Sequence, residues 1–466
     1  MLVNHFFLWS FWAFASYYLF LIFYYFILNL VGFFEYLRRG KEHQEENYEV
    51  LSFSSFTIPV SIIIPAHNEE IWIADCVQSI LNLKYPEYEV IIVDDGSTDK
   101  TMSILKELLK LKFVYNSYTD HFSSGRIVGL YRSETYPHVT SISKISGGTK
   151  AAAVNAGLNI AKYKFICVLD CDTVLEEDAL LKVMAEVHKD PEKVIGIGSY
   201  FGLVNGFKIR KGKVVEHSFS KKPIIAHQNL EYIRSFIGNR IGWSKFNAMP
   251  NVAGGFGVWR RDILLKLGGY DPQFSSEDIE FTFRAHDYRA KHRKNRYQIL
   301  MLPHYVGWTE GPSDMVGLIN QRDRWQRVTI EAVWRYKYML FNPKFGMFGL
   351  FTFPYFVFYE VFGVFMEVAS VIITICGYLM GYLNVDVFLG FVVLMTLSQT
   401  LASLMPLFTF NMDQELFKIE EIIYFIFLSL VEFFWYRWLI SFGKIIGTFN
   451  YIRGVKTFNR IRRAGA

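Results

Sequence analysis

Two aspartates follow a short apolar run at the point where a buried strand would end. The run covers residues 164–169, and Asp170 and Asp172 come directly after it. In an extended backbone, residues i and i+2 point to the same side, so both carboxylates can face one divalent cation while Cys171 turns into the fold. The alternative is a turn in which Asp172 or Thr173 caps an acidic helix. The spacing predicts a metal site if other polar loops meet at the same place.

Two units of strand, loop and helix come before this stretch. Residues 58–64 and 89–93 predict buried strands, and each is followed by a polar loop and a helix. This alternation is typical of a parallel doubly wound sheet, whose ligands bind at the carboxyl ends of strands. The second loop begins with Asp94 and Asp95, which can accept hydrogen bonds from ribose hydroxyls or from the N3–H of uracil. An Asx turn that caps the next helix explains the same residues.

A pair of glycines opens a third helix. Gly147 and Gly148 precede an alanine-rich run whose first turn carries Lys150. Backbone N–H groups at a helix start and a nearby cation favour an anion, so this segment is a candidate for holding a diphosphate. It lacks the spacing of a P-loop. A capped, alanine-rich helix is the structural alternative.

The next segments are expected to cover the side where an acceptor binds. Residues 194–205 and 207–215 flank Gly206 and predict a hairpin, and residues 227–240 predict an amphipathic helix. Residues 251–260 predict a strand whose glycines allow a sugar or a glycan chain to approach the backbone. The candidate contacts on this strand are Gly254, Gly255, Phe256 and Trp259.

Three carboxylates then open a helix, beginning with Glu277 and Asp278. Asp278 is the candidate general base for an acceptor hydroxyl, whereas a Ser-capped helix with acidic residues in its first turn is the alternative. Residues 321–327 begin a later helix, in which Arg324 could neutralise a departing diphosphate and Trp325 offers an aromatic face to a sugar. An interfacial cationic helix would have the same composition.

The composition indicates a membrane protein with a large soluble domain. Of the 466 residues, 52% are hydrophobic and 18% are aromatic, which is too apolar for an ordinary soluble enzyme. Residues 1–34 contain no Asp, Glu, Lys or Arg, and this run predicts a transmembrane helix over about residues 6–31. Arg38, Arg39 and Lys41 follow it, so the positive-inside rule places the next domain in the cytoplasm.

The C-terminal part is apolar again. Residues 361–385 and 387–412 predict membrane spans, and residues 422–442 predict a weaker third span because they carry two charges. Residues 343–359 predict an interfacial helix.

The net charge of +5 suits membrane lipids or a diphosphate better than nucleic acid, and no nucleic-acid motif is present. The four cysteines, Cys76, Cys167, Cys171 and Cys376, lack metal-site spacing and predict free thiols.

Seven blocks in order carry a resemblance to a known family. PAHNEE, VDDGSTD, GGTKAAAVNAGL, DCD, AGGFGVWRRD, SED and QRDRW resemble the membrane-integrated family 2 glycosyltransferases with a GT-A fold. This group contains the cellulose, chitin, hyaluronan and poly-N-acetylglucosamine synthases. Each block is weak alone, but together they cover roughly residues 58–330. The resemblance implies an α/β, Rossmann-like mixed sheet with one N-terminal and about two to four C-terminal membrane helices.

The resemblance also implies a site for a UDP-sugar and for Mg²⁺ or Mn²⁺. Asp170 and Asp172 would hold the metal with UDP, and Asp278, with Glu277 beside it, would act as the base. The implied donor contacts are Pro65, Asn68, Glu69, Asp94, Asp95, Lys150, Asp170, Gln321, Arg324 and Trp325. The implied acceptor contacts are Gly254, Gly255, Phe256, Trp259 and Trp325.

The expected activity is that of an inverting hexosyltransferase, with UDP-N-acetylglucosamine as the favoured donor. It would build a β-linked polysaccharide or oligosaccharide and export it through its own helices. There Glu360, Glu367 and Glu432 would line a glycan path, lie at interfacial depth or pair with arginines. The alternatives are a non-processive transferase that adds one sugar to a lipid or short glycan, and a catalytically dead membrane scaffold. The expected partners are the donor, a glycan or lipid acceptor and membrane lipids, and an accessory membrane or export subunit is compatible with this role.

The expected location is the plasma or inner membrane, with the catalytic domain in the cytoplasm. The predicted parts are an N-terminal transmembrane helix (1–36), a linker (37–57), a GT-A domain (58–335), interfacial and transmembrane helices (336–450) and a basic tail (451–466).

Overall fold

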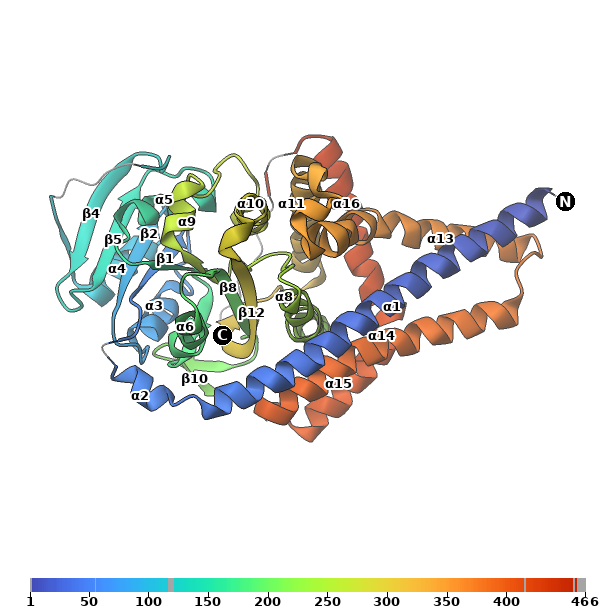
Figure 1. Ribbon diagram of the computed structural model, residues 1–466, viewed down its shortest axis with the longest axis horizontal. Helices are drawn as coiled ribbons and strands as arrows, with labels where there is room; N and C mark the ends of the chain where they lie inside the picture. The colour runs from blue at the N-terminus through green and yellow to red at the C-terminus, as the bar shows by residue number, and fades with distance from the viewer. Residues whose placement is uncertain (1, 55, 116–120, 415, 456, 459–466) are drawn as a thin grey trace.

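The chain folds into an α/β domain and a helical region that extends away from it (Figure 1). The computed structural model describes residues 2–54, 56–115, 121–414, 416–455 and 457–458. Helix α1 (Leu2–Glu45) runs from the far end of the helical region, where the N-terminus lies, to the edge of the α/β domain.

Among the described residues, ten strands form one mixed sheet in the order β3-β4-β5-β2-β1-β6-β11-β8-β12-β7. β1 pairs in parallel with β2 and β6, whereas β11 lies antiparallel between β6 and β8. The predicted α/β fold with a mixed sheet is confirmed. The strands are β1 (Val60–Ala66), β2 (Tyr88–Asp94), β3 (Leu111–Phe113), β4 (Ile127–Ser133), β5 (Val139–Lys144), β6 (Phe165–Leu169), β7 (Thr173–Leu175), β8 (Val194–Leu203), β11 (Phe256–Arg260) and β12 (Gln298–Thr309).

Helices cover the sheet and continue into the second region. Those of the α/β domain are α2 (Tyr48–Ser52), α3 (Ile73–Leu81), α4 (Thr101–Leu109), α5 (Lys150–Ile160), α6 (Ala179–Lys189), α7 (Pro223–Ile233), α8 (Ile241–Lys245), α9 (Arg261–Lys266), α10 (Glu277–Lys291) and α11 (Met315–Arg335). Those that follow are α12 (Phe353–Tyr355), α13 (Gly363–Leu379), α14 (Val385–Gln414), α15 (Ile419–Val431) and α16 (Tyr436–Ile452). The π-helical segments are η1 (Arg234–Arg240), η5 (Phe348–Thr352) and η6 (Phe356–Val361), and the 3₁₀ segments are η2 (Arg293–Asn295), η3 (Lys337–Met339), η4 (Pro343–Phe345) and η7 (Glu432–Phe434).

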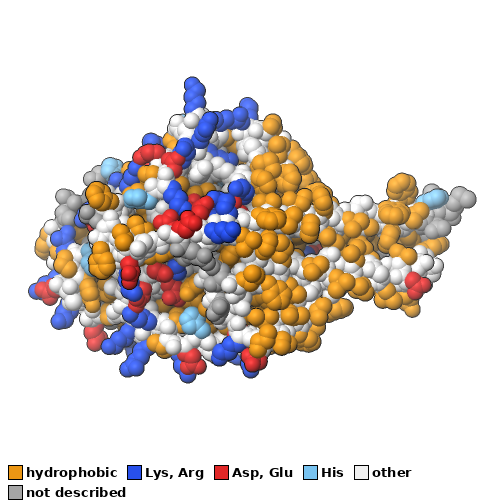
Figure 2. All heavy atoms as spheres, turned by 60° about the horizontal axis from the view of Figure 1, so that its bottom comes forward, with side chains coloured by type: hydrophobic (Ala, Val, Ile, Leu, Met, Phe, Trp, Pro, Cys, Tyr) orange, Lys and Arg blue, Asp and Glu red, His pale blue; other side chains and the backbone are white. Residues whose placement is uncertain are grey.

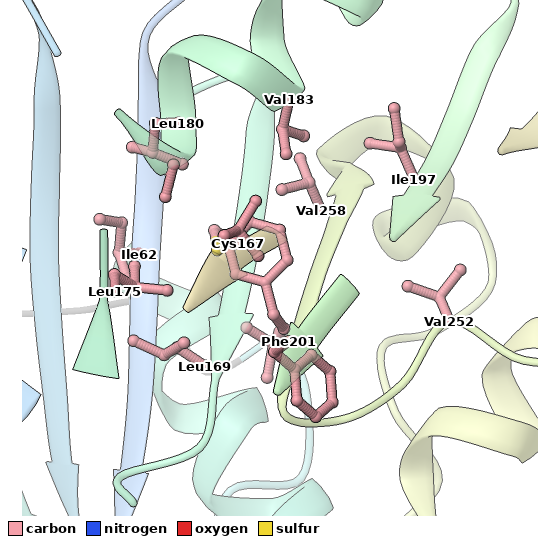
Figure 3. Packing of buried hydrophobic residues seen from close by; sticks show 14 of the residues in the cluster. Ile62, Cys167, Leu169, Leu175, Leu180, Val183, Ile197, Phe201, Val252 and Val258 are labelled. Carbon is pink, nitrogen blue, oxygen red and sulfur yellow. The ribbon is translucent and has the colours of Figure 1, made fainter. Parts of the chain in front are cut away.

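Apolar sequence explains the central strands. Every residue of β6 and of β8 is buried, because elements pack on both faces of the sheet. Figure 3 shows Ile62 of β1, Cys167 of β6 and Val258 of β11 in this core, with Leu180 and Val183 of α6 packed against them. The strands therefore form a rigid base from which the polar loops project.

The loops after β1 and β2 leave the same edge of the sheet and are tied together. Asn68 has a φ of 57°, a left-handed conformation that asparagine tolerates. Its side-chain oxygen accepts hydrogen bonds from the N–H groups of Thr98, at 2.7 Å, and Asp99, at 3.3 Å. Because β6 is also parallel to β1, the loop with Asp170 starts at this edge too.

The helical region is apolar enough to lie in a membrane. Within the described residues, His5–Glu42 and Val385–Met412 can each cross a membrane by length and composition. Two bent pairs would add a span each: Phe348–Val361 with Gly363–Leu379, bent by 46°, and Ile419–Phe434 with Tyr436–Ile452, bent by 51°. Figure 2 shows hydrophobic side chains over most of this region, whereas charged side chains gather on the α/β domain. The prediction of apolar helices at both ends of the chain is confirmed.

Three glutamates were expected to line a glycan path, to lie at interfacial depth or to pair with arginines; all three form ion pairs, two with arginines and one with a lysine. Burying a charge among apolar helices is costly unless an opposite charge and hydrogen bonds compensate it. The pairs are Glu360 with Lys444 (2.7 Å), Glu367 with Arg437, and Glu432 with Arg234 (2.8 Å).

Some predicted elements differ from the structure. The first helix is longer than predicted and continues through the first part of the predicted linker to Glu45. The hairpin around Gly206 is wrong: β8 joins the main sheet, and a separate hairpin of β9 (Lys208–Arg210) and β10 (Lys213–Glu216) turns at Gly212, which has a φ of 70°. The last predicted span is broken between Val431 and Tyr436. Most of the predicted basic tail lies outside the described residues.

Helices α11 and α16 pack closely at two glycines. A Cβ on Gly447 would lie 2.6 Å from the Asp323 carbonyl oxygen, and one on Gly443 would lie 2.7 Å from the Arg322 Cβ. We expect Gly447→Ala to lower the free energy of unfolding by about 1–3 kcal/mol, because the facing backbone has no room to move. Thermal unfolding in detergent measures this change. The control is Gly390→Ala, where nothing lies within 4 Å, and equal midpoints for the two variants would contradict the close packing.

Candidate active site

One cavity joins most of the predicted site residues. Its volume is about 3080 Å³, and it extends from the loops after β1, β2 and β6 to the space between α1, α13 and α14. Asp94, Phe256 and Trp259 do not line it. The predicted residues on its wall are Pro65, Asn68, Glu69, Asp95, Lys150, Asp170, Asp172, Gly254, Gly255, Glu277, Asp278, Gln321, Arg324 and Trp325.

Lys150 lies between two carboxylates from different elements. Its Nζ is 2.5 Å from Asp170 Oδ1 and 2.6 Å from Glu277 Oε1, and it donates to the Gly254 carbonyl oxygen at 3.1 Å. Thr149 caps α5 and so fixes Lys150 at the start of that helix. Burial lowers the pKa of Lys150, but the two carboxylates outweigh burial and raise this pKa above its ordinary value. The ammonium group therefore joins the end of β6 to the start of α10.

Asp170 and Asp172 both face the cavity, as their i, i+2 spacing predicts. The Asp170 side chain is 37% exposed and lines the cavity. Burial within the protein, together with the charges of Asp172 and Glu277, raises the pKa of Asp170 to about 6, although Lys150 lowers it. Asp172 Oδ1 accepts a hydrogen bond from the Thr309 hydroxyl at 3.2 Å. Negative charge is thus in excess at this part of the wall.

These carboxylates fit a divalent cation that shares its ligands with a substrate. Mg²⁺ commonly takes one or two protein carboxylates and completes its shell with phosphate oxygens and water, and carboxylate oxygens also suit Mn²⁺. In the described part of the chain, no three His, Cys, Asp or Glu side chains gather as a metal cage. Two aspartates and the oxygens of a diphosphate are therefore the ligand set that this site can supply.

The Asp278 carboxylate is held in place by three donors. Its Oδ2 accepts from the Gly254 N–H at 3.1 Å, and its Oδ1 accepts from the Ser276 hydroxyl at 2.7 Å and the Ile279 N–H at 2.8 Å. Ser276 is the N-cap residue of α10, but its side chain donates to Asp278 and makes no capping hydrogen bond. A carboxylate fixed on a cavity wall has the geometry that a general base needs.

Gly254 leaves room for this group of charges. A methyl group at position 254 would lie 2.9 Å from both Glu277 Oε1 and Lys150 Nζ. We expect Gly254→Ala to slow sugar transfer by up to about 100-fold, because displacing reacting groups by about 1 Å can cost that much. Transfer of labelled sugar measures the effect. Gly40→Ala, with nothing within 4 Å, is the control and should keep full activity. Equal rates would mean that the geometry around Gly254 is not critical.

The two adjacent aspartates after β2 face different ways. Asp94 accepts a hydrogen bond from the Ser97 N–H at 3.1 Å and does not line the cavity, so it closes the loop after β2. It does not cap the next helix, since the N-cap residue of α4 is Lys100. Asp95 lines the cavity, pairs with the Lys144 ammonium group and accepts from the Gly147 N–H at 2.9 Å. Asp95 therefore holds the glycine loop before α5, and it is the one of the pair that can reach a ligand.

Helix α11 brings the predicted Arg324 and Trp325 to the cavity. The Arg322 guanidinium lies 4.3 Å from the centroid of the Trp325 ring and forms a two-bond ion pair with Glu231 at 2.7 and 2.8 Å. Arg324 is exposed on the cavity wall, and the buried Gln321 Oε1 has no hydrogen-bond partner among the described residues. Arg322 thus fixes Trp325, while Gln321 and Arg324 remain available to a ligand.

Phe256 and Trp259 lie in the core instead of the cavity. They are 0% and 3% exposed, because β11 is covered on both faces. The Trp259 ring packs edge-on against Phe281, with centroids 4.7 Å apart, and a Cβ on Gly196 would come within 2.3 Å of it. Neither ring can meet a sugar, so we do not retain them as acceptor contacts.

Some cavity residues had no recognised signal in the sequence. Thr309 ends β12 and donates to Asp172, and Glu310 accepts from the Trp72 indole N–H at 2.6 Å. Both residues lie at the end of β12, so a prediction of this strand would have made them candidate ligand contacts, because ligands bind at strand ends. Tyr232 and Arg240 also line the cavity, but they lie in a segment predicted as an ordinary amphipathic helix.

Two family models match the sequence. The model of glycosyl transferase family 2 matches residues 61–267, and that of glycosyl transferase family group 2 matches residues 165–436, which is more than half of the chain. The chain belongs to the family 2 glycosyltransferases. It is therefore a transferase enzyme, and both Asp170 and Asp278 lie within the longer match.

The chain is similar to curated members of the family at low identity. It is 28% identical over 326 residues to a probable glycosyltransferase, YdaM, of Bacillus subtilis, a match that covers 68% of this chain and 66% of the relative. It is 27% identical over 317 residues to a poly-beta-1,6-N-acetyl-D-glucosamine synthase of Staphylococcus epidermidis (67% and 62%). It is 28% identical over 297 residues to a beta-monoglucosyldiacylglycerol synthase of Nostoc (62% and 51%). The matches thus span between about half and two thirds of the length of these relatives.

A solved structure supports the fold. The mannosyltransferase PcManGT from Pyrobaculum calidifontis, in complex with GDP-Man and Mn²⁺, matches 90% of this chain and 99% of its own, with a TM-score of 0.53 and 17% identity. At this identity the likeness shows the GT-A-like fold alone.

Proposed function

We propose that this protein is an inverting membrane glycosyltransferase that builds a β-linked glycan from a UDP-sugar, with UDP-N-acetylglucosamine as the favoured donor. The observation that carries the proposal is the continuous cavity, which connects Lys150, Asp170 and Asp278 with the space between the membrane helices. A growing chain can leave the site by this route. The catalytic domain is proposed to lie in the cytoplasm, next to Arg38 and Arg39.

The reaction we propose is a single displacement. Asp278 accepts the proton of an acceptor hydroxyl while the oxygen attacks the anomeric carbon, and the nucleoside diphosphate leaves from the opposite side. One displacement inverts the centre, so an α-linked donor gives a β-linked product. The three donors that hold Asp278 keep one face of its carboxylate directed to the cavity.

The leaving diphosphate needs positive charge around it. Lys150 is half-buried beside Asp170, and Arg324 is exposed on the wall of the same cavity. Bound Mg²⁺ or Mn²⁺ would supply Lewis-acid stabilisation of the diphosphate, and Asp170 and Asp172 are the residues that would hold it. Asp95, Asn68 and Gln321 are proposed as further contacts of the donor.

One part of the cavity wall between the membrane helices suits a carbohydrate. Polar and charged side chains continue along it, and each charged one is already paired, so it offers hydrogen bonds without an uncompensated charge. The residues that do this are Glu360, Glu367, Gln399, Glu432, Arg437 and Lys444.

The donor is tested by measuring the release of nucleoside diphosphate from protein in nanodiscs, with Mn²⁺ or Mg²⁺, a panel of UDP-sugars and GDP-mannose. The Staphylococcus relative, a poly-beta-1,6-N-acetyl-D-glucosamine synthase, supports N-acetylglucosamine as the donor sugar. We expect UDP-N-acetylglucosamine to give the highest turnover. Turnover with another UDP-sugar only would replace the donor, and turnover with none, including GDP-mannose, would refute the proposed function.

A second candidate is transfer of one sugar to a lipid acceptor. Between α1, α13 and α14 the cavity is lined largely by apolar side chains, which can hold acyl or prenyl chains, among them Phe7, Phe11, Phe388 and Phe391. The relative named as a glucosyldiacylglycerol synthase supports this alternative. A lipid-soluble product that carries one sugar would favour it over polymer synthesis.

A further inference from the structure

A shielded arginine faces the cavity without a partner. Arg240 is the last residue of η1 and lines the cavity. Its buried Nη1 has no hydrogen-bond partner, and its guanidinium forms no ion pair, among the described residues. Arg234, at the other end of η1, is fully engaged by Glu432 and Ser403. An unsatisfied buried donor is costly, so a cationic one beside a cavity points to a missing ligand.

One aromatic ring and two polar groups surround the Arg240 guanidinium. The guanidinium lies 4.1 Å from the centroid of the Phe236 ring, which covers one of its faces. Burial lowers the pKa of Arg240 to about 10, while the negative charge of Asp278 and the Tyr232 hydroxyl act in the opposite direction. Arg240 is therefore charged at neutral pH, and it shares the cavity with Asp278 without an ion pair between them.

The backbone at this position is unusual. η1 follows α7 and precedes α8, so it is a π-helical stretch inside one longer helix. Such stretches are rare and occur frequently at functional sites. Here the wider turn ends at Arg240, while Gly238 of this stretch and Gly242 of α8 lie against α1.

Aromatic rings form a wall beside the arginine. Tyr232 and Phe236 are stacked with centroids 5.8 Å apart, and Phe201 lies 5.0 Å from Phe236. This wall borders the glycine segment next to the base, since a Cβ on Gly255 would lie 2.9 Å from the Phe201 ring. Rings beside hydrogen-bond donors are a common way to hold a sugar, which has apolar faces and polar edges.

The charges around Arg240 indicate an acceptor rather than the donor. Its charge is influenced by Asp278 and Tyr232, whereas Lys150 pairs with Asp170 and Glu277. An anionic acceptor group placed here would be repelled by Asp278. A neutral sugar, whose hydroxyl or amide oxygens accept hydrogen bonds, avoids this repulsion.

We propose that Arg240 is an acceptor-binding residue. Its guanidinium donates to an oxygen of the terminal acceptor sugar, next to the hydroxyl from which Asp278 takes the proton. The sugar then lies against Tyr232, which is the half-buried ring of this wall. This inference rests on the proposed function and names the part of the site that orients the acceptor.

The test measures two affinities separately in nanodisc-embedded full-length protein. The probes are UDP with Mn²⁺, and a β-1,6-linked N-acetylglucosamine oligosaccharide added to the UDP-bound protein. We expect Arg240→Gln to raise the Kd of the oligosaccharide about 10- to 100-fold, the value of a hydrogen bond from a charged donor, and to leave the Kd of UDP unchanged. Arg240→Lys keeps the charge without the planar fork and should give an intermediate Kd.

The control is Arg132→Gln, an exposed arginine of β4 outside the cavity, which should change neither Kd. An unchanged oligosaccharide Kd in Arg240→Gln would overturn the inference, as would an equal loss of UDP affinity, which would assign Arg240 to the donor. If Arg240→Gln does not fold, as judged by thermal unfolding, Arg240→Lys provides the comparison. A wild-type protein that binds UDP but not the oligosaccharide would also overturn it, whereas absence of turnover with every nucleotide sugar would instead refute the proposed function.

Discussion

Replacing Asp278 by asparagine is expected to slow glycosyl transfer by about 10²- to 10⁴-fold, the usual contribution of a general base. Asparagine has the same shape, and its side-chain oxygen can still accept from the N–H groups of Gly254 or Ile279. It cannot take a proton from an acceptor hydroxyl. The affinity for UDP should therefore stay unchanged while turnover falls, and radiolabelled transfer combined with UDP titration measures both.

The control for this variant is Asp287→Asn. Asp287 lies on the same helix, α10, but pairs with Lys291 outside the cavity. It should keep normal turnover. Near-normal transfer by Asp278→Asn would remove Asp278 from the role of base and leave Glu277, which is already paired with Lys150, as the next carboxylate to test.

Replacing Asp172 by asparagine is expected to weaken the metal-dependent binding of UDP by about 100-fold or more, since even changes in the outer shell of a metal cost about 10- to 100-fold. Asp170, Asp172 and Glu277 surround the place proposed for the diphosphate, and one lysine does not balance them. Without a bound cation, these carboxylates would repel the diphosphate. Isothermal titration of UDP with and without Mn²⁺ separates the metal-dependent part of the affinity.

Asp178→Asn is the matched control for this experiment. Asp178 follows the same strands, but it pairs with Lys182 at 2.8 Å and its side chain is 41% exposed outside the cavity. It should bind UDP and Mn²⁺ normally. If Mn²⁺ does not raise the UDP affinity of either protein, and the wild-type and Asp172→Asn proteins bind UDP equally well, this would argue against a cation at Asp170 and Asp172.

The sequence predicted the parts of the site that depend on strand ends and local spacing. Asp170 and Asp172 both line the cavity as predicted, but Cys171 and Asp172 lie in a turn, closed by the Thr173 N–H donating to the Asp170 carbonyl oxygen at 3.1 Å, and not in extended backbone. Strand alternation separates Asp94, the last residue of β2, from Asp95, because adjacent residues of a strand point to opposite sides. That is why one of them faces the cavity while the other closes a turn.

Long-range packing decided what the sequence alone did not. The residue pattern of 256–260 suits an edge strand as well as a central strand, so the sequence did not show whether Phe256 and Trp259 are buried. They are buried because β11 is inserted between β6 and β8. The helix predicted over residues 227–240 exists, but its π-helical turn has no sequence signature. The charges of Glu432 and Arg437 made the last span a weaker prediction. Their partners, Arg234 and Glu367, lie far away in the chain, so the sequence did not show that these charges are paired.

The most direct test of the account is the length of the product early in the reaction. The enzyme in nanodiscs is supplied with UDP-N-acetylglucosamine, Mn²⁺ and an excess of short β-1,6-linked oligosaccharide, and the products are sized by mass spectrometry. We predict long β-linked chains while most of the acceptor is still unextended, because the product stays in the cavity between additions. Products that carry a single added sugar at all times would contradict it.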